Sequence, residues 1–334
     1  MENPVTKKNL PHVFKTVTLG DIDLYDRLTN FSLGTHADSL QQSIEEIGVT
    51  HPVTLVPVGD RFRIACGHRR VLISTLLELN KIPAWILSSS SGDESMLMLN
   101  LSENQIHRHY SAIEKGLILT KLSESNVPEG RIIEKHMPML GLERSKKLLA
   151  GYLSIIQLTP GLQNLLHEAN VPLRTFSILF RWNSESATAA EKFFSILRPG
   201  ANKWRDLLEW IDEICMRDEI TPFELLSLPE LQSVLKQNDL PPNTRYERVR
   251  QLLYSKRYPM LNDMQIRLAK ALDALKLDDK TRVHIQDSFE SDEIRVEMKF
   301  RTREQFINQI EKLVRASGSD ALDELIRIFQ NPQD

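Results

Sequence analysis

Four consecutive residues, Gly67, His68, Arg69 and Arg70, have the types and spacing to hold a phosphate group. They lie where an alternating strand pattern over 61–66 changes to a helical pattern over 71–79. A glycine at such a turn lets the backbone approach a ligand closely, and the first turn of a helix offers free N–H groups to an anion. The two arginines would add bidentate phosphate donors. The same residues also suit an ordinary surface turn with two solvated arginines.

A second candidate site is the pair Glu103 and Asn104, at the end of a helical pattern over 94–103. A carboxylate beside an amide can hold a hydrated Mg²⁺ against phosphates. The alternative is a polar helix end with a capping asparagine. His107 and His109 follow closely, but an i, i+2 spacing would point them apart and no cysteine accompanies them, so zinc is not favoured.

A third cluster, Arg144, Ser145, Lys146 and Lys147, has the composition of a DNA contact. It begins a predicted helix over 145–156, which a turn at Gly141 joins to a helix over 131–140. Two helices around a short glycine-containing turn indicate a helix-turn-helix, whose second helix enters the major groove. Ser145 would be the N-cap. The turn looks about two residues longer than is typical, and Pro138 should interrupt the pairing of the first helix. A solvated helix face is the alternative.

The charge distribution favours the DNA interpretation of this third cluster. Residues 121–200 carry 10 basic and 7 acidic side chains, a net charge of +3. Residues 1–120 carry 11 and 13, a net −2, and residues 201–334 carry 21 and 25, a net −4. The whole chain, at −3, is therefore not a polycation that coats nucleic acid, but it has room for one local basic site.

The elements that must position these residues fall into three predicted parts, 1–120, 121–200 and 201–334. The first is an α+β domain of strand, helix, strand, strand, helix and strand, at 14–24, 39–47, 52–58, 61–66, 71–79 and 82–87. The second is all-α and ends at Pro199-Gly200. The third is helical as far as 277 and then gives a hairpin and two helices. Ile294, Val296, Met298 and Phe300 alternate with charged residues, which predicts a half-buried strand. One hairpin alone would be marginal, so residues 263–315 are interpreted as a module completed by a second copy.

The amino-acid composition limits which classes of protein the chain can belong to. The chain has 334 residues, of which 41% are hydrophobic and 26% charged, as is usual for a globular protein. Its two cysteines, Cys66 and Cys215, cannot build a disulfide framework. The N-terminus lacks a signal-peptide pattern and no apolar run reaches membrane-spanning length. We therefore expect a cytoplasmic protein without a membrane partner.

Several blocks, in order and spacing, resemble the N-terminal domain of ParB-type partition proteins over about residues 14–120. They are 42–48, 51–54, 62–70, 82–84, 102–108 and 112–114. Residues 140–166 are similar to the family's helix-turn-helix domain and the segment after it, and 281–315 are similar, more weakly, to its C-terminal dimer domain. Residues 199–262 match nothing in the family.

The resemblance implies a function and a set of site residues. ParB-type proteins bind a palindromic centromere site on double-stranded DNA as homodimers, bind CTP with Mg²⁺, close into a clamp and stimulate a ParA-type ATPase. On this resemblance Gly67, Arg69 and Arg70 contact the nucleotide phosphates, while Glu103 and Asn104 lie by the metal. We also place His68 in the nucleotide site and take Glu103 as the catalytic candidate for weak CTP hydrolysis.

The sequence departs from the family pattern at a few positions. His68 stands where glutamate is usual, Ile106, His107 and Arg108 replace the usual continuation, and Ser111-Ala112 replaces Asn-Pro. We therefore expect a more positive pocket. These departures leave open whether the pocket is specific for CTP and whether it hydrolyses the nucleotide.

Two other classes of protein compete with the partition interpretation. One is a kinase of the same ParB/sulfiredoxin-like fold, using ATP and Glu103 as base; sulfiredoxin chemistry is disfavoured because Cys66 lies one residue too early. The other is a transcriptional or conjugation regulator without a ParA partner.

Overall fold

The computed structural model describes residues 12–33, 38–87, 92–104, 109–237, 239–277, 280–284 and 294–330. The chain forms two compact units, which divide between Tyr246 and Glu247 within one helix. Each unit is described by itself. The three predicted parts remain a prediction, since 1–120 and 121–200 both belong to the first unit.

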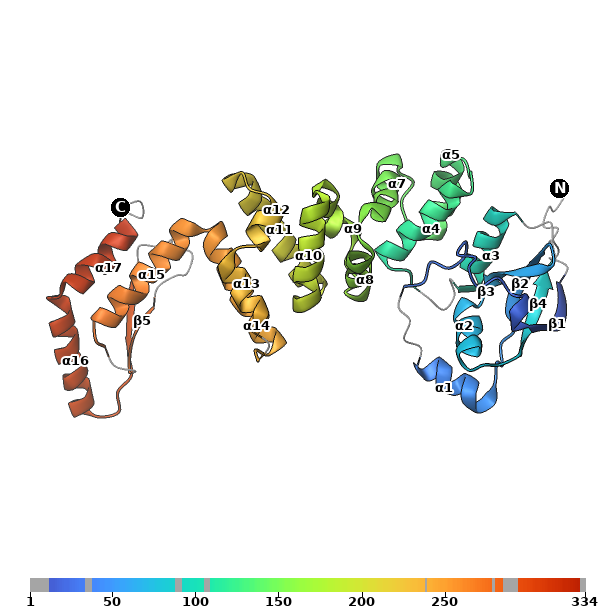
Figure 1. The fold of residues 1–334 in the computed structure, drawn as a ribbon. Helices are drawn as coiled ribbons and strands as arrows, with labels where there is room; N and C mark the ends of the chain where they lie inside the picture. The colour runs from blue at the N-terminus through green and yellow to red at the C-terminus, as the bar shows by residue number, and fades with distance from the viewer. Residues whose placement is uncertain are drawn as a thin grey trace, which may run out of the picture. The chain divides into compact units, whose positions relative to one another are not determined.

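The first unit begins with a four-stranded mixed sheet in the order β1-β4-β2-β3, as Figure 1 shows. Its elements are β1 (His12–Thr18), α1 (Asp38–Ile47), β2 (Val53–Val58), β3 (Arg61–Cys66), α2 (His68–Leu76), β4 (Lys81–Leu87) and α3 (Asp93–Asn104). β1 and β4 are antiparallel, β4 and β2 are parallel, and β2 and β3 form the hairpin. The predicted α+β order is confirmed.

The core of this domain explains why β2 lies at the centre. Val53, Leu55 and Val56 are all buried, so β2 is covered on both faces, unlike an alternating strand of a one-sided sheet. Val71 from α2 joins the cluster that Val53 and Leu55 form, and α3 contacts β3. The two turns at the ends of β3, the hairpin turn and the turn into α2, are therefore anchored to the buried central strand β2.

The predicted helix 131–140 is observed as three short pieces. They are α5 (Glu129–Arg131), a π-helical turn (Ile132–His136) and α6 (Met137–Met139). Pro138 has no backbone N–H and lies just after the π turn, where the helix is wider. The expected interruption of the helix is confirmed. Gly141, with φ of +69°, then ends the helix; the amides of Gly141 and Leu142 bond to the carbonyls of Pro138 and Met137.

The helices that follow complete the first unit. They are α4 (Ala112–Glu124), which precedes this segment, α7 (Lys146–Leu153), α8 (Pro160–Glu168), α9 (Leu173–Phe176), α10 (Ser184–Leu197), α11 (Ala201–Asp218), α12 (Pro222–Leu226), α13 (Pro229–Lys236) and α14 (Pro242–Arg257), which runs into the second unit. The sequence pattern predicts one helix over 224–236, but Pro229 starts a new helix there. Trp204 of α11 is buried and stacks on Phe194 of α10 at 3.7 Å, across the predicted boundary.

The second unit contains α15 (Pro259–Ala274), the hairpin of β5 (Thr281–His284) and β6 (Arg295–Met298), α16 (Arg303–Ser317) and α17 (Asp320–Gln330). The strands are antiparallel and pair Thr281 with Met298 and Val283 with Val296. The predicted order of helix, two strands and helices is observed, but the predicted alternation of buried and exposed residues along β6 is wrong, because Val296 and Phe300 are exposed. A small core of Ala271, Leu275, Ala316 and Leu325 holds the helices together.

No helix of the described ranges is long and apolar enough to cross a membrane.

Candidate nucleotide and DNA sites

Gly67 is the N-cap of α2 and has a left-handed backbone, with φ of +101°. A Cβ built on it would lie 2.7 Å from Cγ1 of Val53 and 3.1 Å from the Arg70 guanidinium. No side chain caps the helix and no acidic residue occupies its first turn. The turn therefore requires glycine for two reasons and leaves the positive end of α2 open to an anion.

The two arginines of this turn have different surroundings. Arg69 is exposed, and its guanidinium is 3.4 Å from the carbonyl of Leu33. Arg70 instead donates to the carbonyls of His51 and Pro52 at 2.5 and 2.8 Å. Burial lowers the pKa of Arg70, while the Glu103 carboxylate acts in the opposite direction. Arg70 thus holds the strand entry of β2 in place, and Arg69 is the more exposed of the two arginines.

Glu103, although 33 residues after Arg70, lies beside the same turn. Burial, and then the Glu103 carboxylate, raise the pKa of the Cys66 thiol well above its usual range, and the same carboxylate acts on Arg70. The structure therefore brings the end of α3 to the turn before α2, joining two of the predicted site clusters. A protonated thiol is a poor nucleophile, in accord with the argument against sulfiredoxin chemistry.

Asn104 and the end of α3 are fixed by amide contacts. The Asn100 side chain donates to the carbonyl of Ala65 at 2.7 Å, and the Asn104 side chain donates to the Asn100 carbonyl at 2.8 Å. The Asn104 side-chain oxygen remains the atom that could face a hydrated cation. The described residues hold no group of three or more His, Cys, Asp or Glu side chains arranged for a metal, so a Mg²⁺ here would depend on phosphate and water oxygens.

His68 is largely buried beside the loop that contains Asp26. Burial lowers its pKa to about 4, against the opposing effect of Asp26. Its ring donates to the backbone carbonyl of Asp26, and Nε2 has no hydrogen-bond partner among the described residues. His68 is therefore neutral at pH 7: compared with the usual glutamate it removes a negative charge from the pocket but adds no positive one. The other departures, Ile106, His107 and Arg108, lie outside the described residues.

An ion-pair network that the sequence pattern did not reveal supports the loop beside His68. Arg63 of β3 pairs with Asp26 at 2.6 Å and with Asp93, at the start of α3, at 2.9 Å. Burial alone would raise the pKa of Asp26, but the hydrogen bonds from Arg63 and Leu28 outweigh it and lower that pKa. The three side chains are 30 or more residues apart in the chain, so no spacing rule could have joined them.

The DNA candidates lie at the exposed start of α7. Ser145 is the N-cap and accepts from the amide of Leu148, as expected. Arg144 pairs with Glu134 at 3.2 Å and Lys146 with Glu129 at 3.0 Å, both on the surface, where such pairs are weak. Lys147 is exposed. The three cations are thus presented together on one helix start, as a phosphate contact requires.

Glu94, at the start of α3, connects the sheet domain to the segment before α7. Its carboxylate accepts from Nε of Arg131 at 3.1 Å and lies 3.0 Å from Nε2 of His136, whose side chain is fully buried. Burial lowers the pKa of His136 despite Glu94. The helix α3 therefore contacts the turn before α2 at one end and the segment before α7 at the other.

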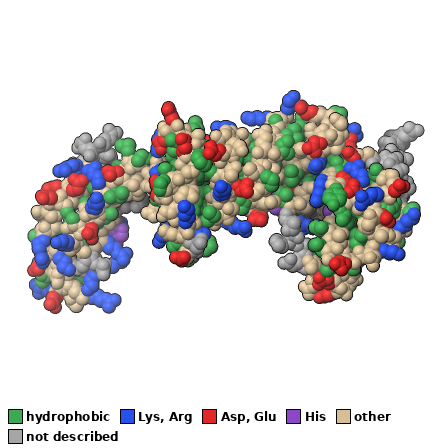
Figure 2. Space-filling view, viewed as in Figure 1, with side chains coloured by type: hydrophobic (Ala, Val, Ile, Leu, Met, Phe, Trp, Pro, Cys, Tyr) green, Lys and Arg blue, Asp and Glu red, His purple; other side chains and the backbone are tan. Residues whose placement is uncertain are grey.

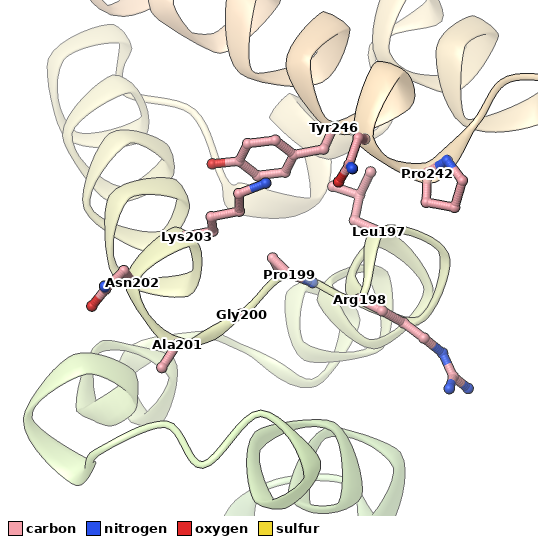
Figure 3. A pocket seen from close by; sticks show the side chains of 10 residues that line it. Leu197, Arg198, Pro199, Gly200, Ala201, Asn202, Lys203, Pro242 and Tyr246 are labelled. Carbon is pink, nitrogen blue, oxygen red and sulfur yellow. The ribbon is translucent and has the colours of Figure 1, made fainter.

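A hollow of about 450 Å³ lies elsewhere, between the starts of α11 and α14 (Figure 3). Lys203 places its ammonium 3.9 Å above the ring of Tyr246, and Arg198 points away from the opening. It includes none of the predicted site residues.

Comparisons with known proteins find relatives of the N-terminal domain. Residues 14–105 match the family described as the ParB N-terminal domain. The chain is 27% identical over 137 residues to a probable chromosome-partitioning protein ParB of Coxiella burnetii, covering 41% of this chain and 44% of that protein. It is 26% identical over 128 residues to a probable plasmid-partitioning protein ParB of Thermus thermophilus, covering 33% and 42%. The aligned part spans less than half the length of these relatives.

One solved structure is a C-terminally truncated chromosome-partitioning protein ParB from Caulobacter crescentus complexed with CTP-gamma-S. It has 17% identity and a TM-score of 0.26, and covers 60% of this chain and 99% of that chain. The N-terminal part of the chain is a ParB-type domain. The resemblance to ParB-type partition proteins stated from the sequence is confirmed there.

Proposed function

We propose that this protein is a nucleotide-regulated, DNA-binding protein of plasmid or chromosome partition. The observation that carries the proposal is the meeting of Glu103 with Cys66 and Arg70 at the Gly67 turn of a ParB N-terminal domain. The partition relatives in Coxiella and Thermus support the biological role.

The nucleotide is CTP, held by its phosphates. The first turn of α2 has no side-chain cap and can face an anion, and Arg69 supplies a charged donor. Glu103 and Asn104 fit beside a Mg²⁺ that the phosphates carry. Bound CTP would supply the negative charge that this turn lacks. We expect CTP hydrolysis to be slow. Glu103 is the candidate base, and the ring of His68 is engaged in a hydrogen bond with the backbone of Asp26.

The DNA partner is a palindromic duplex site, contacted by Arg144, Lys146 and Lys147 from the start of α7. Two half-sites require two copies of the chain. The second unit offers the contact: Phe306, Ile307, Ile310 and Val314 form an exposed apolar stripe on α16, while the inward position 309 holds a buried glutamine. An outward stripe of this kind is expected to be covered, and a homodimer covers it with its own copy. A ParA-type ATPase is the proposed partner in the cytoplasm.

Calorimetry with CTP, ATP, GTP and UTP in the presence of Mg²⁺ tests the nucleotide proposal. We expect CTP binding, and a loss of about tenfold or more in affinity for Arg69→Ala, because a charged phosphate contact is removed. Lys81→Ala, an exposed cation at the start of β4, is the control and should bind as the wild type does. Absence of CTP binding, or equal losses in both variants, would contradict the proposal.

A selection from random duplexes tests the DNA proposal separately. We expect a palindromic consensus that the double variant Lys146→Ala with Lys147→Ala no longer enriches. A genomic neighbour of the ParA type would separate partition from simple regulation. Transfer of labelled phosphate from ATP to an acceptor would instead favour the kinase alternative.

A further inference from the structure

The helix α10 has a buried face and an exposed face. Ala190 and Phe194 are buried in the first unit, whereas Glu185, Thr188 and Lys192 are exposed. Residues three and four positions apart are neighbours on the surface of a helix, so the three exposed residues form one stripe along α10. This stripe is about two helical turns long.

A groove of about 670 Å³ lies along this stripe, between α10 and the pair α12 and α13. The amide of Phe223 in α12 donates to the Ser186 hydroxyl at 3.2 Å, which places α12 beside the first turn of α10. The apolar residues that line the groove are Phe193, Ile196, Phe223, Leu226 and Leu235. Ile196, near the end of α10, is 40% exposed. An apolar groove of this size at the surface is expected to receive a partner.

Two of the described residues that line the groove are charged, and they have opposite signs. They are Glu185 and Lys192. Seven residues of helix separate them by about 10.5 Å along the axis, too far for a direct ion pair. Among the described residues, neither has an oppositely charged side chain within ion-pair distance. Thr188 and Ala189 lie midway between them, so the stripe has an acid at one end, a base at the other and small side chains at its centre.

This arrangement of charges is complementary to itself. When two copies of α10 pack antiparallel about a two-fold axis between Thr188 and Ala189, Glu185 of each copy faces Lys192 of the other. Small side chains at the axis let the two helices approach closely. The last turn of one helix then lies over the first turn of the other, so Ile196 comes to the Phe223 that lies beside that turn. Both the charged and the apolar parts of the groove are therefore matched by the same surface of a second copy.

We propose that the stripe and groove of α10, here called the α10 surface, bind the α10 surface of a second copy of this chain. The occupant is a second copy because an antiparallel α10 supplies both opposite charges at the required spacing. Figure 2 shows basic, acidic and hydrophobic side chains next to one another over α10 to α13, so this region lacks the field of one charge that nucleic acid attracts. The contact is separate from the stripe on α16 and does not depend on the proposed function.

Charge reversal in the full-length chain tests the pairing. The parent for all variants carries Ile307→Lys, so that the stripe on α16 contributes little to association. Glu185→Lys and Lys192→Glu should each weaken self-association by about tenfold or more, because both symmetric pairs become like-charged. The double variant Glu185→Lys with Lys192→Glu should regain the affinity of the parent. Glu209→Lys, at an exposed position on α11, is the control for the change in net charge. Sedimentation equilibrium measures each dissociation constant.

Mixing the two single variants tests whether the pairing is between copies. A mixed pair places the two lysines of one chain opposite the two glutamates of the other. The mixture should therefore associate about as tightly as the parent, although each variant alone does not. Added salt should weaken the mixed pair, because exposed charges are screened. A mixture that associates no more tightly than either variant alone overturns the inference.

The remaining outcomes separate this contact from other occupants and from the proposed homodimer. A parent protein that stays monomeric overturns the inference, and so does a loss that Glu185→Lys and Glu209→Lys share equally. Association that neither charge reversal changes assigns the contact to another surface and also overturns it. If Ile307→Lys leaves the association of the wild type unchanged, the homodimer through α16 is contradicted instead, while the mixture still decides the contact through α10.

Discussion

At Gly67, both the backbone conformation and the lack of space for a Cβ require glycine. Its φ of +101° disfavours any L side chain, and a Cβ would meet Val53 at 2.7 Å. Gly141 has φ of +69° but nothing within 4 Å of a Cβ. Gly67→Ala should therefore lower the free energy of unfolding by about 1–3 kcal/mol more than Gly141→Ala. Urea unfolding of both variants checks this, and equal losses would show that Val53 yields without cost.

His68 gives the protein a specific pH dependence. Its folded-state pKa of about 4 lies below the ordinary 6.5, so the unfolded chain takes up the proton first as the pH falls. This contribution to stability is present above about pH 6.5 and is lost between there and pH 4. Between pH 7 and pH 5 the wild type should lose about 2 kcal/mol more than His68→Gln. Chemical unfolding at both pH values measures it, and parallel losses in the two proteins would refute the assignment.

At the scale of elements, two glycines in neighbouring helices have opposite roles. A Cβ on Gly116 of α4 would clash with Cδ1 of Ile155 and lie 2.9 Å from the carbonyl of Tyr152. A Cβ on Gly151 of α7 would meet only Leu173, at an ordinary 3.4 Å. The packing of α4 against α7 and the turn after it therefore depends on Gly116.

Alanine at these two positions should change stability in opposite directions. Gly151→Ala should stabilise by up to about 1 kcal/mol through helix propensity, while Gly116→Ala should destabilise by about 1–3 kcal/mol through overpacking. The midpoint of urea unfolding for each variant gives the sign directly. Stabilisation by both would mean that α4 and α7 can separate slightly at no cost.

The helix α3 makes side-chain contacts with different parts of the first unit at its two ends. Glu94 at its start binds Arg131 and lies against the buried His136, and Glu103 at its end lies beside Arg70 and Cys66. The residues next to Glu103 in the chain indicate it as a candidate, but no local pattern indicates Glu94. Its partner His136 is 42 residues away, and only the packing of the helices brings them together.

At the scale of the whole molecule, the proposed homodimer predicts that the stripe on α16 is an interface. Ile307→Lys should weaken self-association by about tenfold or more, because a half-exposed apolar side chain is replaced by a charge at a surface that the partner covers. Met216→Lys, at an exposed apolar position on α11, is the control. Analytical ultracentrifugation over a range of concentrations measures both. A wild-type protein that stays monomeric throughout would contradict the homodimer.

By itself, the sequence determined most of the local elements and indicated the candidate site residues. Periodicity placed the strands, the hairpin and most helices, and local chemistry placed the Ser145 cap and the Gly67 turn, because these depend on neighbours within a few residues. The tertiary structure alone decided which residues meet and in what state. It brought Glu103 to Arg70 and buried His68, which lowers the pKa of that histidine to about 4. Packing between segments far apart in the chain sets which side chains are buried and which lie close together. Neither a pattern of neighbouring residues nor the net charge of a long stretch of sequence contains that information.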